Sequence, residues 1–586
     1  MLKVFKYMGK YWMSAVAALI LLGVQAFCDL MLPQYTSAII DNGILSTGEG
    51  SAVRVDYILS VGGEMLIVAL IAAGATVLNS FISSRVGAGI GRNLREKVFK
   101  RVLSYSNAEL NKFSTASLIT RCTNDIQQIQ MVSTILLRIA LFAPIMGCIS
   151  VIKVIRTGAG MTWVIALAVL MVLSLIIFLI TFTMPKFKIM QSLIDRLNLV
   201  SREILTGLSV IRAFRREDRE EERFDEANKD LMQTQLFTNR MMSIMPSGMM
   251  FIMNATAILI TWVASHRINL GLMRVGTMTE FIMYSMHVVM SFLFMTMLSI
   301  ILPRAGVAAE RIEEVLKEES SIKNAPDAEE LKIEKGTIVF DHVDFAYPDA
   351  GERVLEDITF TAESGKTTAF IGSTGSGKST LVNLIPRFYD ITAGSIKIDG
   401  KDIRNVTLDS LRDGIGFVPQ KAVLFSGTIA SNLRFGKGDA DEKALTDAAE
   451  TAQAADFISE KDDKYDSHIS QGGTNVSGGQ KQRLAIARAL VKDPKILVFD
   501  DSFSALDMKT DSLLRKALKD KVKDKTVLIV AQRISTIINA DRIVVLDEGK
   551  IVGIGTHKEL LKNCEVYEQI ATSQLSEKEL GIERGA

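Results

Sequence analysis

Long apolar runs alternate with long polar stretches up to about Pro303, and beyond Leu331 the pattern is that of a soluble α/β protein. A membrane-spanning helix needs about 20 mostly apolar residues. Six stretches approach this length, so we predict spans at residues 12–33, 58–82, 131–155, 161–184, 245–264 and 281–303. The third is the weakest, because Arg138 and Lys153 flank its apolar part, and we expect Arg138 to snorkel. The first run is too long for a signal-peptide core and lacks a small-residue cleavage site, so we expect a retained anchor.

Basic residues collect before the first span and in the two long connections, which follow the second and fourth spans. Acidic residues dominate the shorter connection after the first span. The positive-inside rule therefore places the N-terminus, both long connections and the C-terminal half in the cytoplasm. The basic residues are Lys3, Lys6, Lys10, Arg85, Arg92, Arg95, Lys97, Lys100, Arg101, Lys112, Arg121, Lys186, Lys188, Arg196, Arg202, Arg212, Arg215, Arg216 and Arg219; the acidic residues are Asp41, Glu49 and Asp56.

The two long connections have a helical pattern. Residues 85–102 and 186–205 contain almost no helix breakers and keep an apolar period near 3.6. We read them as cytoplasmic extensions of the membrane helices, and about 20 such residues would reach roughly 30 Å below the bilayer. A polar break in each, near residues 107–113 and 213–219, could hold a short transverse helix. The alternative is that the charged faces are simply solvated.

Composition and charge exclude several classes of protein. The chain has 586 residues, of which 48% are hydrophobic and 23% are charged, and its net charge is +1. These values do not suit a disordered chain or a globally basic nucleic-acid binder. The four cysteines, Cys28, Cys122, Cys148 and Cys564, lie far apart and match no zinc, redox or disulfide pattern.

A phosphate-binding loop lies in the C-terminal half. Residues 367–371 form a short apolar run typical of a strand, and a helical pattern covers residues 381–385. The G-x-x-x-x-G-K-S spacing between them suits a loop whose backbone N–H groups wrap phosphate oxygens at a helix N-terminus. We predict that Lys378 reaches the β- and γ-phosphates of ATP and that the Ser379 hydroxyl ligates Mg²⁺. The loop consists of Gly372, Ser373, Thr374, Gly375, Ser376, Gly377, Lys378, Ser379 and Thr380.

Two further segments complete the pattern. An apolar run at residues 496–499 ends in Asp500, the expected second element on the Mg²⁺ side. Between it and the loop lie Ser477, Gly478, Gly479 and Gln480 at the start of a helical run, a second candidate anion-binding nest. With these motifs in this order, the chain resembles an ATP-binding cassette (ABC) exporter half-transporter over essentially its whole length.

The resemblance implies a fold, a partition into domains and further roles. It implies an all-α transmembrane domain at residues 1–303 with long cytoplasmic helical extensions, a linker at residues 304–330 and an α/β ATP-binding domain at residues 331–586. It also implies that Tyr347 stacks on adenine and that Gln420 senses Mg²⁺ and water. In the family two cassettes pair head to tail, so Ser477–Gln480 would contact the ATP of the other subunit. The segment exchanged between cassettes would be Ser504, Ala505, Leu506 and Asp507.

Two positions depart from the family pattern. The family has a glutamate that polarises the attacking water where this chain has Asp501, and a histidine where this chain has Gln532. The aspartate is one methylene shorter, and a misplacement of about one ångström can cost about 10²-fold in rate. A neutral amide can donate to the γ-phosphate but cannot carry positive charge. We therefore expect this chain's own site to bind ATP and hydrolyse it poorly; the alternative is that Asp501 is a tolerated substitute at a working site.

These departures indicate a heterodimer. A homodimer would have two weakened sites, so we expect a second half-transporter subunit that carries the glutamate and the histidine. The complex would couple ATP binding and hydrolysis to outward transport of amphiphilic drugs, lipids or peptides across a membrane, by analogy the bacterial plasma membrane. The alternative function is a nucleotide-gated scaffold or regulator without pumping. An importer is disfavoured because importers usually keep spans and cassette on separate chains, and an export peptidase because only ten residues precede the first span.

Several polar and sulfur-containing side chains lie inside the predicted spans. Ionisable groups there usually face a cavity or mark a pathway, although a place near the headgroups explains Asp29 and Glu64 as well. Methionines in the last two spans suit a promiscuous binding surface, and lipid-facing packing explains them equally. The polar residues are Gln25, Asp29, Glu64, Asn254 and His287, and the methionines are Met245, Met249, Met250, Met253, Met283, Met286, Met290, Met295 and Met297.

Overall fold

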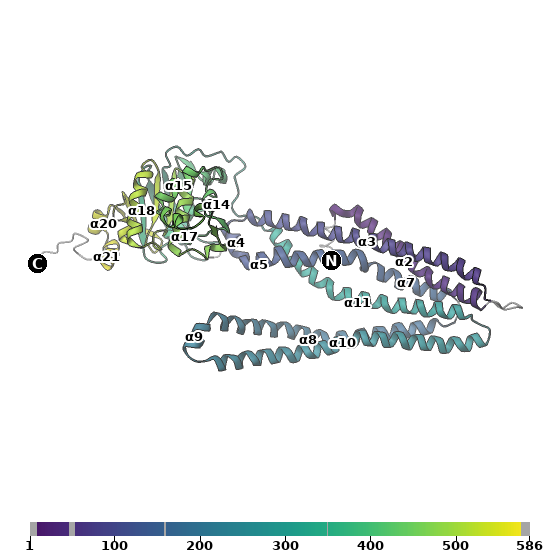
Figure 1. The fold of residues 1–586 in the computed structure, drawn as a ribbon. Helices are drawn as coiled ribbons and strands as arrows, with labels where there is room; N and C mark the ends of the chain where they lie inside the picture. The colour runs from purple at the N-terminus through teal and green to yellow at the C-terminus, as the bar shows by residue number, and fades with distance from the viewer. Residues whose placement is uncertain (1–8, 46–52, 158–159, 349, 576–586) are drawn as a thin grey trace. The chain divides into compact units, whose positions relative to one another are not determined.

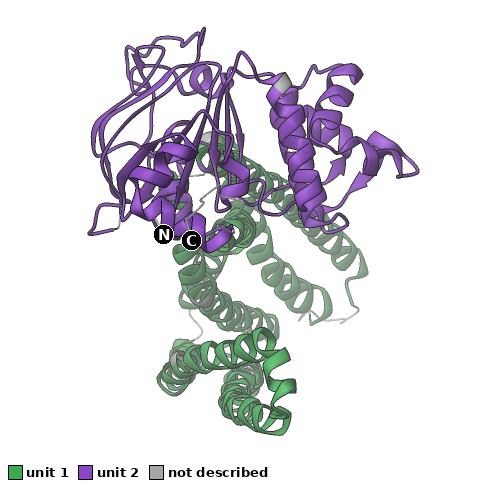
Figure 2. Ribbon diagram, turned by 90° about the vertical axis from the view of Figure 1, so that its left-hand side faces the viewer, with its two compact units in different colours: residues 1–101, 116–317 green, residues 102–115, 318–586 purple. Residues whose placement is uncertain are grey.

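The computed structural model describes residues 9–45, 53–157, 160–348 and 350–575 (Figure 1). Lys3, Lys6 and Glu49, which enter the charge argument, lie outside the described residues. The chain divides into two compact units (Figure 2). The helical unit comprises residues 1–101 and 116–317, and the sheet unit comprises residues 102–115 and 318–586.

The helical unit contains the six predicted spans as helices that are long and apolar enough to cross a bilayer, counted over the described residues. Helices suit such apolar runs because each satisfies its backbone hydrogen bonds internally. The first span is α2 (Trp12–Ala38), which follows the 3₁₀ turn η1 (Gly9–Tyr11) and continues into the π-helical segment η2 (Ile39–Ile44). The other continuous ones are α3 (Val55–Leu103), α8 (Thr162–Thr206), α10 (Glu217–Asn269) and α11 (Val275–Lys317).

The third span is interrupted, but the expectation that it is the weakest is wrong: its mean hydropathy is 2.3, whereas that of the fifth span is 1.6. It has α-helical and π-helical pieces in turn, and Arg138 lies on the second π-helical piece. A π-helical turn shifts the side chains that follow it to a new direction and is often found at functional sites. The pieces are α5 (Thr115–Thr120), η3 (Arg121–Asp125), α6 (Ile126–Ile135), η4 (Leu136–Ala140) and α7 (Phe142–Arg156).

The predicted helical extensions are confirmed, since residues 85–102 belong to α3 and residues 186–205 to α8. The last helix is longer than expected. Helix α11 runs to Lys317, so residues 304–317 of the expected linker are helical. Ala305, Ala308, Ile312 and Val315 are buried at helical spacing there, and this apolar stripe carries the helix onward.

One of the two transverse helices lies where the pattern placed it. Helix α4 (Asn107–Phe113) coincides with the predicted segment. The other prediction, at residues 213–219, is wrong, because the short helix is α9 (Leu208–Ala213) and residues 217–219 already belong to α10. The chain turns through Arg215, whose φ is +52°, so the polar break is a turn. Figure 1 shows α8, α9 and α10 as one long hairpin.

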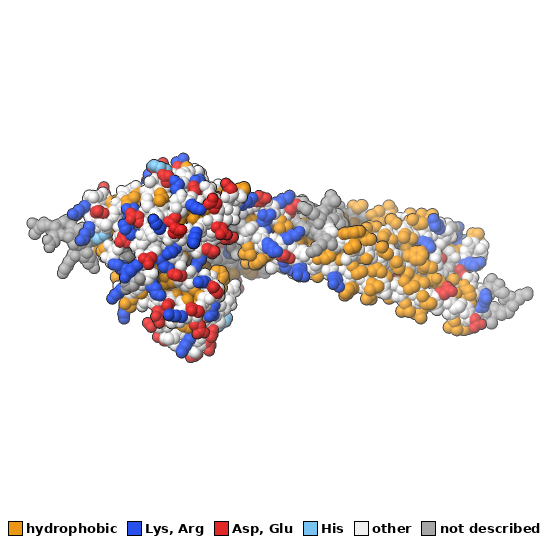
Figure 3. Space-filling model, turned by 90° about the horizontal axis from the view of Figure 1, so that it is seen from above, with side chains coloured by type: hydrophobic (Ala, Val, Ile, Leu, Met, Phe, Trp, Pro, Cys, Tyr) orange, Lys and Arg blue, Asp and Glu red, His pale blue; other side chains and the backbone are white. Residues whose placement is uncertain are grey.

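Apolar side chains cover much of the outside of the helical unit. Figure 3 shows them as a broad band with few charges on the face in view. Leu70, Phe251 and Trp262 are examples whose side chains are more than half exposed. A soluble protein rarely exposes so large an apolar surface, and a bilayer's hydrocarbon would cover it.

The sheet unit has an α/β architecture. A six-stranded sheet has the order β12-β11-β3-β10-β9-β6, and its strands are parallel except for β12. A four-stranded antiparallel sheet, β2-β1-β4-β5, and the pair β7-β8 accompany it. The strands are β1 (Ile338–Phe345), β2 (Leu355–Ala362), β3 (Thr367–Gly372), β4 (Ala393–Ile398), β5 (Lys401–Asp402), β6 (Ile415–Val418), β7 (Gly427–Thr428), β8 (His468–Ile469), β9 (Ile496–Asp500), β10 (Thr526–Val530), β11 (Arg542–Asp547) and β12 (Lys550–Gly555).

Helices pack around these sheets, and two buried apolar clusters, one on each side of the six-stranded sheet, form the core. The central strands β9 and β10 are buried at every position, as expected for strands covered on both faces. The helices are α12 (Lys378–Leu384), α13 (Leu408–Asp413), α14 (Ile429–Arg434), α15 (Glu442–Thr451), α16 (Ala455–Ser459), η5 (Lys464–Asp466), η6 (Gln471–Gly473), α17 (Gly478–Val491), α18 (Met508–Lys521), α19 (Ile534–Ile537), α20 (His557–Asn563) and α21 (Glu565–Gln574).

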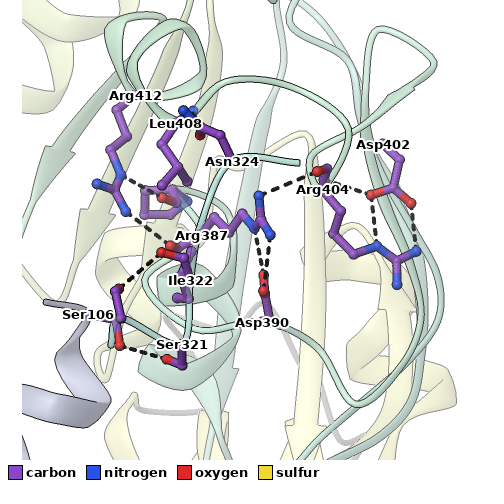
Figure 4. Close-up of polar contacts among 12 residues, drawn as sticks. Ser106, Ser321, Ile322, Asn324, Arg387, Asp390, Asp402, Arg404, Leu408 and Arg412 are labelled. Carbon is purple, nitrogen blue, oxygen red and sulfur yellow. Dashed lines mark hydrogen bonds and ion pairs between the residues drawn. The ribbon is translucent and has the colours of Figure 1, made fainter. Parts of the chain in front are cut away.

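Helix α4 belongs to the sheet unit although it lies between the second and third spans in sequence. The carboxylate of Glu109, which is 5% exposed, accepts the Ser106 and Ser321 backbone N–H groups at 2.8 and 3.1 Å. The Ser106 and Ser321 hydroxyls are 3.0 Å apart (Figure 4). Next to this contact, Asn324 accepts the Leu408 N–H at 2.9 Å. Residues 318–324 therefore link α4 to the start of α13 in the sheet unit.

Removal of the Glu109 carboxylate should loosen α4. We expect Glu109→Ala to lower the stability of the sheet unit by about 1–3 kcal/mol, because buried N–H groups lose a charged acceptor. Thermal unfolding in detergent and limited proteolysis near α4 would measure this loss. Lys112→Ala is the matched control, since its exposed ion pair with Glu318 should contribute only about 0–1 kcal/mol. Equal destabilisation by the two variants would contradict the prediction.

The same contact should depend on pH. Burial alone would raise the pKa of Glu109, but the hydrogen bonds from Ser106 and Ser321 outweigh it and hold the pKa below its ordinary value. A carboxyl with a depressed folded-state pKa stabilises the fold above its unfolded pKa, and this contribution disappears as the pH falls through the folded value. The contribution of Glu109 is therefore complete at neutral pH and lost in acid.

Candidate nucleotide site

The sheet brings the predicted motifs to one edge. Strands β3, β10, β9 and β6 are parallel neighbours, and Val530 pairs with both Phe370 and Asp500 across the register. Val418 pairs with Phe499 in the same way. The phosphate loop, Gln532, Asp501 and Gln420 all follow the carboxyl ends of these strands. In open parallel sheets this edge is where ligands bind.

The phosphate loop depends on glycine. Gly375 and Gly377 both have φ +89°, a backbone conformation that other residues rarely adopt. At Gly377 a Cβ would also lie 2.6 Å from the Leu355 side chain and 3.1 Å from the Val354 carbonyl oxygen. These positions let the chain curl tightly into the N-terminus of α12, so backbone N–H groups can face an anion.

Lys378 begins α12 and bends back over the loop. Its Nζ donates to the carbonyl oxygens of Gly372 and Ser373 at 2.9 and 2.6 Å and to the Ser376 hydroxyl at 3.3 Å. Burial lowers the pKa of Lys378, and the nearby carboxyls of Asp501 and Asp500 oppose that shift. The ammonium group is thus held at the centre of the loop, where an anionic phosphate would complement it.

Ser379 and Asp500 form an oxygen pair beside the loop. The Ser379 hydroxyl donates to Asp500 Oδ1 at 2.7 Å, and Asp500 is only 5% exposed. Burial raises the pKa of Asp500, and the neighbouring Asp501 raises it further. A hydroxyl and a carboxylate are the oxygen ligands that Mg²⁺ takes, and a cation here would also relieve the crowding of two buried acids. The residues present therefore fit a divalent cation.

Asp501 lies where three of the motifs meet. Its carboxylate accepts the Gln532 side-chain amide at 2.8 Å and the Gln420 amide at 3.4 Å. The backbone of Asp501 has φ +47°, and its N–H donates to the Val530 carbonyl oxygen at 3.0 Å. Burial raises the pKa of Asp501, whereas amide donation from Gln420 lowers it. The structure thus joins the two departing residues, Asp501 and Gln532, directly to each other.

Tyr347 lies beside the phosphate loop. Its hydroxyl is 3.0 Å from the Thr380 hydroxyl on α12. Its ring packs edge-on against Phe345 and Tyr389, with centroid separations of 4.9 and 5.2 Å. Tyr389, which no sequence motif marks, supports the Tyr347 ring from a distant part of the chain. The ring position suits an aromatic group that stacks on a base.

The Ser-Gly-Gly-Gln segment starts α17 in an exposed position. Ser477 accepts the Gln480 backbone N–H at 3.3 Å, and the Gln480 side chain accepts the Ser477 N–H at 3.0 Å. This capping box fixes the helix start without using the N–H groups of Gly478 and Gly479. Among the described residues, no hydrogen bond joins this segment to the phosphate loop of the same chain.

The segment Ser504–Asp507 connects the acidic pair to α17 and α18. Ser504 donates its hydroxyl to the Asp501 carbonyl oxygen at 2.9 Å, and Asp507 caps α18 by accepting the Thr510 N–H at 2.9 Å. A Cβ at Gly479 would lie 3.4 Å from the Ala505 carbonyl oxygen. Leu506 is buried against the same core as α17. A movement of this segment would therefore displace both Asp501 and the start of α17.

Gln574, at the end of α21, braces the segment that carries Gln532. Its side-chain oxygen accepts the Ile534 N–H at 2.8 Å, and its amide donates to the Gln532 carbonyl oxygen at 2.9 Å. Arg515 on α18 adds a bond to the Ser535 carbonyl oxygen at 2.6 Å. Neither Gln574 nor Arg515 could be found from the sequence, because both lie far from Gln532 along the chain and belong to no motif.

Loss of this brace should be visible at the backbone. We expect Gln574→Ala to speed amide exchange at Ile534 and its neighbours about tenfold, since the variant removes the acceptor of the Ile534 N–H. Hydrogen exchange read by mass spectrometry would measure it. Gln569→Ala on the same helix is the control, because the Gln569 side chain donates to Glu565 within α21 and not to the segment that carries Gln532. Unchanged exchange at residues 532–536 would contradict the brace.

Two comparisons establish the family. Residues 15–292 match the family model of the ABC transporter transmembrane region, and residues 355–504 match the family model named ABC transporter. The chain therefore belongs to the ABC transporters, and it is an exporter half-transporter with its membrane and ATPase domains on one polypeptide. A fold of six spans and a cytoplasmic ATPase domain, as predicted, makes it a multi-pass membrane protein that couples ATP hydrolysis to transport.

Similar proteins come from several bacteria. An uncharacterized ABC transporter ATP-binding protein of Mycobacterium tuberculosis is 40% identical over 561 residues, 94% of each chain. A Staphylococcus aureus protein named for a proposed multidrug export ATP-binding/permease role is 30% identical over 579 residues, 98% of each chain. The solved structure of a bacterial Atm1-family ABC exporter with ATP bound is 25% identical, with a TM-score of 0.78 over 98% of this chain and 99% of that one.

Proposed function

We propose that this chain is the hydrolysis-poor half of a heterodimeric exporter of amphiphilic compounds. The observation that carries the proposal is the bond from Gln532 to Asp501, at 2.8 Å. It ties the two residues that depart from the family pattern into one contact. The relative named for multidrug export supports the choice of amphiphilic compounds as the cargo.

The nucleotide would bind to this chain's own loop. Backbone N–H groups of the loop and the Lys378 ammonium would hold the phosphates, and Tyr347 would stack on the base. Ser379, Asp500 and Gln420 would hold Mg²⁺, which when bound neutralises phosphate charge during transfer. None of these residues departs from the family's ATP-binding motifs, so we expect ATP to occupy this site most of the time.

Hydrolysis is the step that should be weak. A general base must reach the attacking water with a free carboxylate oxygen. In Asp501 the carboxylate is one methylene shorter than glutamate, and amides from Gln532 and Gln420 engage the same oxygen, Oδ2. These two amide donors hold the Asp501 carboxylate in place through Oδ2. The Gln532 side chain is neutral, so it brings no positive charge toward the γ-phosphate. Together these features favour binding over turnover.

The second site would be built differently. Ser477, Gly478 and Gly479 present an exposed helix start whose N–H groups are not used by the capping box. Such a start can bind the γ-phosphate of a nucleotide on another subunit. A partner half-transporter with a glutamate and a histidine at the two departing positions would supply a competent site. This chain would then complete that site with its intact signature.

Transport in vesicles tests the proposed function against a scaffold role. Inverted vesicles that contain this chain and its partner should accumulate a fluorescent amphiphilic dye when ATP is added, and vesicles with Lys378→Ala in this chain should hold less nucleotide. ATP-dependent accumulation supports the exporter. ATP binding without accumulation of any amphiphile would favour the nucleotide-gated scaffold.

Purification of the tagged chain from its native membrane tests the partner. A second half-transporter in near-equal amount is the expected result. A complex that contains only this chain, with brisk ATP turnover, would overturn the heterodimer.

A further inference from the structure

A small cavity opens between four of the helical unit's spans. It has a volume of about 170 Å³ and is lined by residues of α2, α3, α11 and the junction of η4 with α7. Its polar residues are Gln25, Thr76, Asn79, Ser80 and Arg138, and its apolar walls come from Ile139, Phe142 and Phe294. All of these residues fall inside the predicted spans, so the cavity belongs to the membrane-spanning part of the helical unit rather than to the cytoplasmic extensions.

Arg138 is the charged group of this cavity. It lies on the π-helical segment η4, which interrupts the third span, and its side chain is exposed. No hydrogen bond or ion pair joins Arg138 to another residue within the described parts of the chain. A guanidinium group at this depth is costly unless an anion or water meets it, and unpaired charges inside spans generally mark a binding site or pathway.

Asn79 gives the cavity a second, fixed donor. The residue is 3% exposed, and its Oδ1 accepts the Ser83 hydroxyl at 3.1 Å. That bond orients the amide and leaves its Nδ2 donors for another group. Among the described residues that line the cavity none carries a carboxylate. The polar side of the cavity therefore offers amide and hydroxyl groups beside one positive charge.

We propose that this cavity binds the anionic headgroup of an amphiphile, with Arg138 pairing to a carboxylate, sulfonate or phosphate. The volume suits a headgroup and not a whole molecule, so the apolar body would lie along Phe142 and Phe294 toward the lipid. The proposal rests on the proposed function, because it names the chemical class of amphiphile that the exporter takes. Charge-assisted pairing to arginine would make the headgroup, and not the hydrocarbon, the selective part.

Binding in a neutral bilayer tests the headgroup. The transporter, this chain with the partner it purifies with, is placed in nanodiscs of phosphatidylcholine, and three fluorescent probes with one hydrocarbon chain are titrated. Their headgroups are a carboxylate, a neutral amide and a trimethylammonium. The carboxylate should bind at least about tenfold more tightly than the other two. Equal affinity for the three headgroups would overturn the proposal without need of any variant.

Variants then locate the effect. Arg138→Gln should abolish the preference for the carboxylate, and Arg138→Lys should keep part of it, because a lysine retains charge but not the guanidinium's paired donors. Arg156→Gln, at the end of α7 and outside the cavity, is the control and should keep the full preference. A preference that survives Arg138→Gln, or that Arg156→Gln removes equally, would show that Arg138 only snorkels toward the headgroups.

Transport separates cargo from resident lipid. In phosphatidylcholine vesicles ATP should move the carboxylate probe, and phosphatidylglycerol should compete with it for the cavity. If the carboxylate probe binds tightly but ATP does not move it, and phosphatidylglycerol displaces it, the same anion site belongs to a bound lipid. Movement of the neutral probe alone would retain the exporter and refute the anion site. If ATP moves none of the probes while the carboxylate still binds and phosphatidylglycerol does not displace it, the anion site stands and the exporter function fails.

Discussion

Gly478→Asp in this chain should lower ATP turnover of the assembled exporter by at least about 100-fold, because it places a carboxylate where backbone N–H groups would meet the partner's nucleotide. Gly478 is exposed at the start of α17, and no neighbour lies within 4 Å of the position a Cβ would take. The substitution should therefore leave the fold of this chain intact. Steady-state phosphate release from the purified complex measures the effect.

Asp501→Ala is the matched variant for the other site. If this chain's own site contributes little hydrolysis, Asp501→Ala should change turnover less than about threefold, and Asp501→Glu should change it only modestly. Removal of the corresponding base in the partner should abolish turnover. Equal losses from Asp501→Ala and from the partner's matching change would refute the asymmetry.

Asp501→Glu combined with Gln532→His should restore hydrolysis at this chain's own site. In a complex whose partner lacks its base, we expect the double change to raise turnover by about 10²-fold, the scale of a one-ångström misplacement of a catalytic group. The longer carboxylate would reach the water, and histidine can carry charge toward the γ-phosphate. Single-turnover hydrolysis of labelled ATP separates this chemical step from nucleotide release.

Each single change serves as a control for the pair. Gln532→His alone leaves the short Asp501 carboxylate, and Asp501→Glu alone leaves the neutral amide, so each should recover only a small part of the gain. If neither the pair nor either single change raises turnover, the weak step lies elsewhere in this chain. If wild-type Asp501 already supports rapid turnover in that complex, the site is competent as it stands.

The fold could be predicted from the sequence wherever one physical constraint dominates. Long apolar runs fix six spans, and a strand-loop-helix with glycines at positive φ fixes the phosphate loop. Boundaries were less predictable. Helix α11 continues past Pro303 on a stripe of buried apolar residues, and α9 lies ahead of the polar break because the break is the turn at Arg215. Polarity marks where a helix ends, but it does not tell a transverse helix from a turn.

The residues of the nucleotide site also fall into those that the sequence predicts and those that it does not. Motif residues at the ends of adjacent strands could be named from the sequence, because parallel strands align their carboxyl ends. The contact between Gln532 and Asp501 follows from that alignment but its geometry does not. Gln574, Arg515 and Tyr389 could not be found, since each acts through a long-range contact that no spacing encodes.

The most direct measurement is the ATP turnover of this polypeptide alone, purified without any second subunit and reconstituted in a bilayer. We expect the lone polypeptide to retain bound ATP while releasing phosphate about 10²-fold more slowly than the assembled complex. Rapid phosphate release by the lone polypeptide, lost on Asp501→Ala, would contradict it.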